Sequence, residues 1–213
     1  NLWGSRTYLS FLEWMEILVI LAVFIITGAL LPAVAVGILL TCVSFMLKYS
    51  KVSCTSGGPI RGGKIQSHER RGPLVQPFVR HVADSWLLVM KLKGFVFIAS
   101  AQTVTAHVRK VMEQEAELPA YRRMRLVIFD CELLDGIDAS GAKAFKKLAA
   151  DARASGVSIQ WSSVTPEFLG VLKSRQIIES EADAFVTLDA AVHALEETVV
   201  VFLVNNQKKL LEL

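Results

Sequence analysis

The sequence predicts an α/β protein, with a mixed or parallel sheet and packed helices, preceded by a short two-helix transmembrane segment. Residues 17–47 contain no charged residue. From residue 126 onward, short apolar runs alternate with stretches of helical periodicity, which favours a mostly parallel sheet. Glycine and proline are frequent between these two regions. The predicted parts, in chain order, are membrane helices at 1–49, a linker at 50–84, an α/β domain at 85–205 and a tail at 206–213.

The composition excludes several classes of protein. Hydrophobic residues make up 53% of the chain, and the mean hydropathy of +0.44 is high for a soluble protein. A net charge of +3 is too small to indicate nucleic-acid binding. The three cysteines are far apart and indicate reduced thiols rather than a disulfide framework or a zinc site. Because the chain begins with Asn1, we expect a fragment or a processed chain.

The uncharged segment lies between Glu16 and Lys48. As a single helix it would be about 46 Å long, more than the ~30 Å hydrocarbon core, whereas two full crossings need roughly 40 residues. Pro32 favours a break, so we predict short helices at 14–27 and 31–49 that pack against a larger membrane body. One tilted, kinked span is an alternative. A soluble helical hairpin is disfavoured because neither helix has a polar face.

Basic residues follow the apolar segment. Between Lys48 and Arg80 there are seven basic residues and one acidic residue. The positive-inside rule therefore predicts an integral membrane protein whose α/β domain is cytoplasmic. The same residues could contact anionic lipid, or they could form a solvated linker that only sets the orientation. The paired glycines in this stretch lack the spacing of a phosphate-binding loop.

The α/β domain is predicted from apolar runs and helix signals. Apolar runs predict strands at 86–92, 95–98, 126–129, 157–161 and 185–188. Periodicity predicts helices at 101–117, 139–155, 166–174 and 189–204. Gly156 is expected to end the second helix in a left-handed conformation, while Thr165 and Asp189 are expected to cap the third and fourth.

The candidate functional residues are Asp138, Ser140 and Gly141, in the stretch Asp-Ala-Ser-Gly that joins a predicted strand to a helix. Asp138 can cap the helix by accepting from a backbone N–H of Ser140 or Gly141, and the role is either this cap alone or a regulatory one. Catalysis is not expected, since no motif activates Ser140. The four histidines show no metal-ligand spacing.

A set of acidic residues surrounds this turn. They are Asp130, Glu132, Asp135 and Asp138. Such an edge could bind a cation, although a solvated loop is the favoured interpretation. We therefore expect no metal and no cofactor.

Three stretches together resemble a known family. They are "LKGFVFIASAQTV" at 92–104, Phe129-Asp130 followed by "GIDASG" at 136–141, and "EWMEILVILAVFIITGALLPAVAVGILLTCVSFMLKYSKV" at 13–52. The set resembles the C-terminal end of a SulP-type anion transporter, in which the α/β part is similar to a STAS domain. In the related anti-sigma factor antagonists the turn reads Asp-Ser-Ser-Gly; here Ala139 replaces its first serine and Ser140 remains.

The resemblance implies secondary transport of sulfate or related anions by a membrane domain that this chain largely lacks. It implies a cytoplasmic STAS domain that serves assembly or regulation. The implied partners are the rest of the transporter membrane domain, a second copy in a homodimer, and membrane lipid, with no nucleic acid. The alternative is a membrane-anchored STAS signalling module of the anti-sigma-antagonist type, and an enzyme is the least favoured class.

Overall fold

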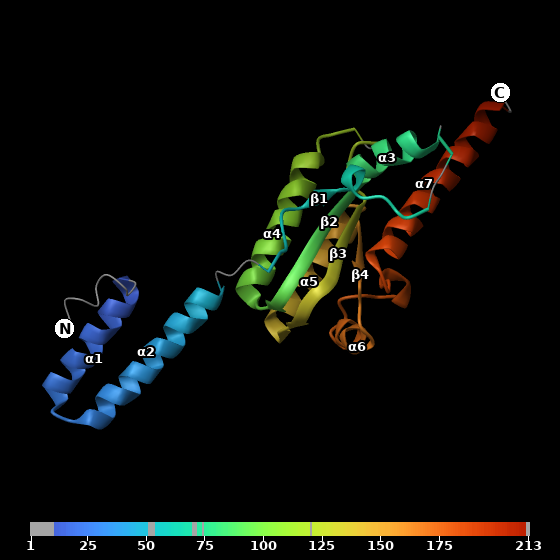
Figure 1. Cartoon of the computed structure of the whole chain (residues 1–213). Helices are drawn as coiled ribbons and strands as arrows, with labels where there is room; N and C mark the ends of the chain where they lie inside the picture. Colours follow the sequence, from blue (N-terminus) through green and yellow to red (C-terminus); the bar gives the residue numbers. More distant parts are fainter. Residues whose placement is uncertain (1–10, 51–53, 70–71, 74, 120, 212–213) are drawn as a thin grey trace. The chain divides into compact units, whose positions relative to one another are not determined.

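The computed structural model describes residues 11–50, 54–69, 72–73, 75–119 and 121–211 (Figure 1). The chain forms two compact units, Asn1–Val52 and Ser53–Leu213. Residues 1–10 of the predicted membrane part, and residues 212–213 of the predicted tail, lie outside the described residues.

The first unit is a pair of helices, α1 (Phe11–Thr27) and α2 (Leu30–Ser50). The helix break lies at Gly28, which has a φ of +60°, and Pro32 sits in the first turn of α2, where its missing N–H costs nothing. Ser44 donates a hydrogen bond to the Glu16 carboxylate across the pair. The two predicted helices are thus present. Among the described residues, no helix combines the length and the apolarity needed to cross a membrane.

The second unit is built around a four-stranded sheet in the order β1-β2-β3-β4. Its strands are β1 (Ile60–Arg61), β2 (Leu87–Val96), β3 (Leu126–Ile137) and β4 (Ser158–Ser162). β2 pairs with β3 and β3 with β4 in parallel, while β1 runs antiparallel along β2. The sheet is therefore mixed, with a parallel centre.

Helices cover both faces of this sheet (Figure 1). They are α3 (Val75–Trp86), α4 (Ile98–Glu115), α5 (Ala139–Ala154), α6 (Pro166–Ser174) and α7 (Leu188–Leu211). Side chains alternate along β3: Val127 and Phe129 pack with α4, α5 and α6, whereas Leu126 and Ile128 pack with α3 and α7. This alternation explains why β3 begins with an uninterrupted apolar run.

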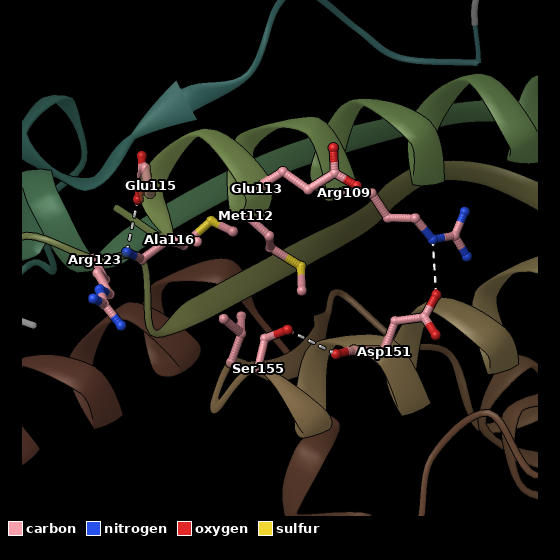
Figure 2. Close-up of a pocket in the computed structure, with 10 residues that line it drawn as sticks. Arg109, Met112, Glu113, Glu115, Ala116, Arg123, Asp151 and Ser155 are labelled. Atoms are coloured by element: carbon pink, nitrogen blue, oxygen red, sulfur yellow. Dashed lines mark hydrogen bonds and ion pairs between the residues drawn. The ribbon is translucent and has the colours of Figure 1, made fainter. Parts of the chain in front are cut away.

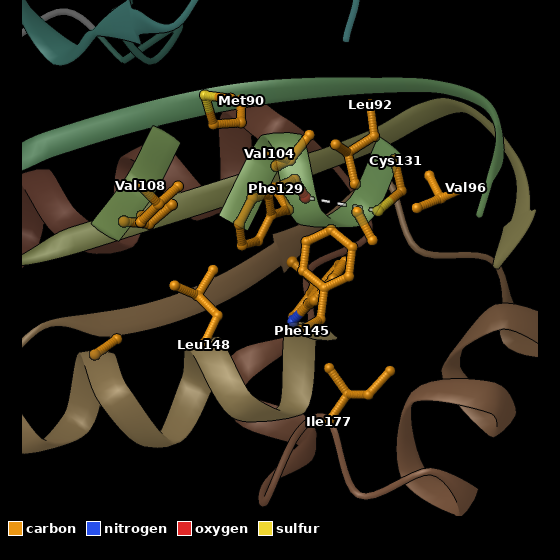
Figure 3. Close-up of a cluster of buried hydrophobic side chains, with 14 of the residues drawn as sticks. Met90, Leu92, Val96, Val104, Val108, Phe129, Cys131, Phe145, Leu148 and Ile177 are labelled. Atoms are coloured by element: carbon orange, nitrogen blue, oxygen red, sulfur yellow. Dashed lines mark hydrogen bonds between the residues drawn. The ribbon is translucent and has the colours of Figure 1, made fainter. Parts of the chain in front are cut away.

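The larger core lies on the α4–α5 face (Figure 3). Phe145 of α5 meets Phe129 edge-on at a ring-centroid distance of 5.1 Å and Trp161 of β4 at 5.3 Å. All three aromatic side chains are almost completely buried. Aromatic packing therefore joins α5 to β3 and β4.

Local signals set the ends of α5 and α6 as predicted. Gly156 follows α5 with a φ of +72°, and Thr165 accepts a hydrogen bond from the backbone N–H of Phe168 at 3.2 Å. For α7 the predicted cap is wrong: Thr187, not Asp189, accepts from the N–H of Ala190 at 3.1 Å. α7 also runs through residues 206–211, which were assigned to the tail.

Several strand predictions are corrected by the pairing. Most of the predicted strands 86–92 and 95–98 forms one strand, β2, with irregular register on both sides of Lys93-Gly94, while Trp86 ends α3 and Ile98 begins α4. β3 continues eight residues beyond Phe129 because β2 pairs with it as far as Ile137. The predicted strand 185–188 is absent: only Ala184 forms a bridge, to Trp161, and α7 begins four residues later.

The stretch predicted as a linker is partly ordered structure. Cys54 and Ser56 exchange backbone hydrogen bonds with Lys93 and Lys91 of β2, at 2.8 Å each. Further along, β1 and most of α3 fall within residues 50–84. The glycines of this stretch permit close approach: a Cβ at Gly62 would lie 2.3 Å from the backbone oxygen of Ala83. Irregular chain was therefore the wrong expectation here.

Candidate functional site

The turn from β3 into α5 places the three predicted site residues together. Asp138 is the N-cap of α5, with φ −76° and ψ 169°, and its carboxylate accepts a hydrogen bond from the backbone N–H of Gly141. Its own N–H donates to the carbonyl of Val96 at 3.1 Å. The predicted cap is confirmed, and the turn is fixed to the end of the neighbouring strand.

Gly141 is buried beneath this cap. A Cβ at this position would lie 2.8 Å from Asp138 Oδ1 and 3.1 Å from the Val96 carbonyl oxygen. The close contact that this glycine permits is therefore made within the domain, by Asp138 and Val96, and not by another molecule. Ser140, by contrast, is exposed in the first turn of α5. Its hydroxyl lies where the positive end of the helix dipole favours an anionic group.

Exposed apolar side chains flank the turn. We call Phe95, Phe97, Ile98 and Leu133 the apolar rim; their exposed fractions are 37, 36, 41 and 55%. The rings of Phe95 and Phe97 lie 4.8 Å apart between centroids. The rim and Ser140 thus occupy the carboxyl ends of β2 and β3, the edge at which parallel sheets commonly carry their binding residues.

The predicted acidic edge is not one cluster. Asp130 is 1% exposed, whereas Glu132 and Asp135 are exposed. One oxygen of Asp130 accepts hydrogen bonds from the hydroxyls of Ser162 at 3.2 Å and Ser163 at 2.7 Å. Its other oxygen lies 3.9 Å from the ammonium of Lys91. Asp130 is therefore a structural carboxylate that joins β2, β3 and β4.

The cysteines are free, and two of them are buried. Burial raises the pKa of the Cys131 thiol far above its ordinary value, and the neighbouring Asp130 charge raises it further. Burial likewise raises the pKa of Cys54, against a lowering by its hydrogen bond with Ser100. Both side chains are packing residues rather than reactive thiols.

A cavity of about 420 Å³ lies at the other end of the strands, near the residues that precede β3 and β4 (Figure 2). Arg109 and Asp151 form an ion pair in its wall, with 2.8 Å between Nε and Oδ2. Glu115 accepts a hydrogen bond from the N–H of Met124 at 2.7 Å. Glu115 also forms an ion pair with Arg61, and side chains of both signs line the cavity, so it presents no single charge to a ligand.

Sequence spacing missed one cluster of side chains of the types that can bind a metal ion. His193 of α7 lies against Glu69 and near Glu197. Glu69 is 124 residues away from His193 in the chain, so no local motif could indicate the contact. The other described histidines take different positions: His68 contacts Asp189, His81 lies on α3 and His107 lies on α4.

Comparison with known proteins identifies the fold. The STAS domain family matches residues 79–194, so this chain belongs to the STAS domain family. Among curated proteins, none matches the chain.

Three solved structures are similar to this chain at low sequence identity, and one of them has a TM-score above 0.5. The murine anion transporter Slc26a9 in its inward-facing state is 14% identical, with a TM-score of 0.55, over 91% of this chain and 30% of that chain. The STAS domain of a SulP transporter from Vibrio cholerae is 16% identical, with a TM-score of 0.44, over 60% and 98%. The anti-sigma factor antagonist SpoIIAA is 17% identical, with a TM-score of 0.35, over 42% and 74%.

Proposed function

We propose that this chain is the C-terminal part of a SulP-like secondary transporter for sulfate or related anions. In this proposal α1 and α2 lie in the membrane beside the rest of the transporter. The STAS domain is cytoplasmic and serves assembly or regulation. The anion site lies on the part of the transporter outside this chain, and the chain is not itself an enzyme.

The observation that carries this proposal is the apolar surface of the helix pair. Large hydrophobic side chains on both helices are exposed, including Ile26 at 82% and Leu31 at 81%. Among the described residues of α1 and α2, Ala33 is the one hydrophobic side chain that is buried. Water disfavours such a surface by about 25 cal/mol for each Å². Lipid or further membrane helices would cover it.

The order of the parts also supports a transporter. An apolar helix pair, a basic stretch and a STAS domain follow one another in this chain, as the SulP resemblance implies. The likeness to murine Slc26a9, a protein described as an anion transporter, extends over 91% of this chain at the level of the fold. The chain spans only 30% of that protein, so the transport activity itself is the proposed part.

We assign a regulatory contact to the turn Asp138-Ala139-Ser140-Gly141. Exposed Ser140 and the exposed apolar rim both lie at the carboxyl ends of β2 and β3, and a protein partner would bind at this edge. A phosphate on Ser140 would gain from the helix N-terminus but would be repelled by Asp138 and Asp135. The alternative, a membrane-anchored signalling module of the anti-sigma-antagonist type, would use this same edge.

Membrane fractionation combined with thiol labelling tests the placement. A chain with Cys42→Ser and Ser155→Cys carries one accessible thiol, on the exposed end of α5. We expect the protein to stay in the membrane pellet after an alkaline carbonate wash. An impermeant maleimide should label residue 155 only after the cells are permeabilised. A chain that is monomeric and soluble without detergent, or labelling in intact cells, would contradict the proposal.

Uptake tests the transport part separately. Cells that produce this chain together with its natural upstream sequence should accumulate labelled sulfate. Removal of residues 85–205 should lower that uptake by reducing the amount of folded transporter. Uptake that is independent of the upstream sequence would place the anion site on this chain and contradict the assignment.

A further inference from the structure

Three consecutive residues, Ser67, His68 and Glu69, are bonded to α7. We call them the strap. Ser67 donates from its N–H and its hydroxyl to the two carboxylate oxygens of Glu196, at 3.2 and 2.6 Å. Both residues of this contact are buried. The strap is therefore anchored to the helix through a buried carboxylate.

His68, the second strap residue, is also bonded to α7. This contact lies one helical turn before the one that Glu69 makes with His193. His68 donates its backbone N–H to Asp189 Oδ1 at 2.8 Å, and its Nδ1 lies 2.9 Å from the same oxygen. Because Ser67 and His68 are both bonded to α7, the position of the next residue, Glu69, is restricted. Its carboxylate contacts His193 Nε2.

The third ligating group comes from the helix itself. His193 and Glu197 are four residues apart on α7, so they project from the same face. His193 Nε2 lies 3.9 Å from Glu197 Oε1. One ligand atom from each of Glu69, His193 and Glu197 can be chosen so that all lie within 4.8 Å of one another. All three side chains are partly open to solvent, so an ion can enter.

We propose that Glu69, His193 and Glu197 bind a zinc ion that fastens the strap to α7. Zinc accepts imidazole nitrogen and carboxylate oxygen at about 2.0–2.2 Å, and three protein ligands leave a fourth position for water. The imidazole favours zinc over magnesium or calcium, which take oxygen ligands. On binding, His193 Nε2 turns from Glu69 to the metal, and the ring proton resides on Nδ1.

Calorimetry on the full chain with zinc chloride tests this site. We expect one zinc ion per chain. Replacement of His193 by Gln, or of Glu69 by Gln, should weaken the affinity at least tenfold. His81→Gln is the matched control, because it removes an exposed imidazole on α3 that belongs neither to the strap nor to the proposed ligands. Its zinc affinity should change by less than twofold.

Magnetic resonance gives a second readout that does not depend on the variants. The ring signals of His193 should shift on zinc addition, and magnesium at millimolar concentration should not reverse the shift. Unchanged His193 signals, or wild-type zinc affinity in the Glu69→Gln variant, would overturn the proposal. The side chain of Glu69 is 56% exposed, so this variant remains informative if His193→Gln fails to fold.

Discussion

Ser163 donates a hydrogen bond to the buried carboxylate of Asp130 at 2.7 Å while its own backbone holds a φ of 57°. A left-handed conformation costs a non-glycine residue roughly 1–2 kcal/mol. A hydrogen bond to a charged group contributes about 1.5–3 kcal/mol. The contact with Asp130 thus offsets the strain that it requires at the end of β4.

The two left-handed non-glycine residues should respond differently to glycine. Ser163→Gly relieves backbone strain but removes a donor from Asp130, so we expect the free energy of unfolding to fall by about 1 kcal/mol or more. Gln176 has a φ of 54° and an exposed side chain, so Gln176→Gly should be neutral or stabilising by up to about 1 kcal/mol. Urea unfolding followed by tryptophan fluorescence measures both. Shifts of the same sign and size would refute the role given to Asp130.

The glycine under the Asp138 cap provides a test of the candidate turn. Gly141→Ala places a methyl group 2.8 Å from the Asp138 carboxylate, and we expect a loss of about 1–3 kcal/mol in the free energy of unfolding. Gly170→Ala is the control, since a Cβ there meets nothing within 4 Å and alanine favours a helix by about 1 kcal/mol. That variant should be more stable than the parent. Equal stability of the two variants would show that the turn accommodates a methyl group at residue 141 without strain.

The aromatic contact between α5 and the sheet predicts a large core effect. Phe145→Ala should cost about 3–5 kcal/mol, because the side chain is 1% exposed and packs on two other aromatic rings. Val186→Ala, at a side chain that is 84% exposed, should change the stability by less than about 0.5 kcal/mol. Thermal unfolding by circular dichroism distinguishes them. A loss below about 1 kcal/mol for Phe145→Ala would mean that the helix does not depend on this cluster.

The buried thiol predicts an alkaline loss of stability. The pKa of Cys131 is raised above its ordinary value of 9.0, mainly by burial, so the folded chain keeps a proton that the unfolded chain releases. The stabilising contribution is complete below pH 9.0 and is lost as the pH rises above it. The slope reaches at most about 1.4 kcal/mol for each pH unit. Urea unfolding between pH 8 and pH 10.5 should show a smaller fall in Cys131→Ala, and an identical fall in both proteins would contradict this origin.

Local signals explain the parts of the fold that could be predicted. The limits of α6 and the cap of α5 depend on residues within one turn of each helix end, so Thr165 and Asp138 are readable without tertiary structure. The length of β3, in contrast, could not be predicted from local sequence. Beyond Phe129 its sequence becomes polar, and only the neighbouring β2 shows that the strand continues to Ile137.

In the candidate site, too, contacts between residues close in the sequence could be predicted, whereas contacts between distant residues could not. Asp138, Ser140 and Gly141 are adjacent in the chain, and their geometry follows from the helix start. The contact between Asp130 and Ser163 spans 33 residues, and that between Glu69 and His193 spans 124. No periodicity or spacing links such pairs, because the sheet order and the strap bring them together.

The segment that pairs with β2 before α3 determines where a fragment of this domain should begin. Cys54 to Arg61 occupies the outer edge of β2, through the bridge of Thr55 to Leu92 and the pairing of Ile60 with Val89. An open strand edge invites pairing between molecules. A protein fragment that starts at residue 79, where the family match begins, would leave this edge bare and should aggregate. Starting at Cys54 keeps the edge sealed, so that position is the better choice for preparing the isolated domain.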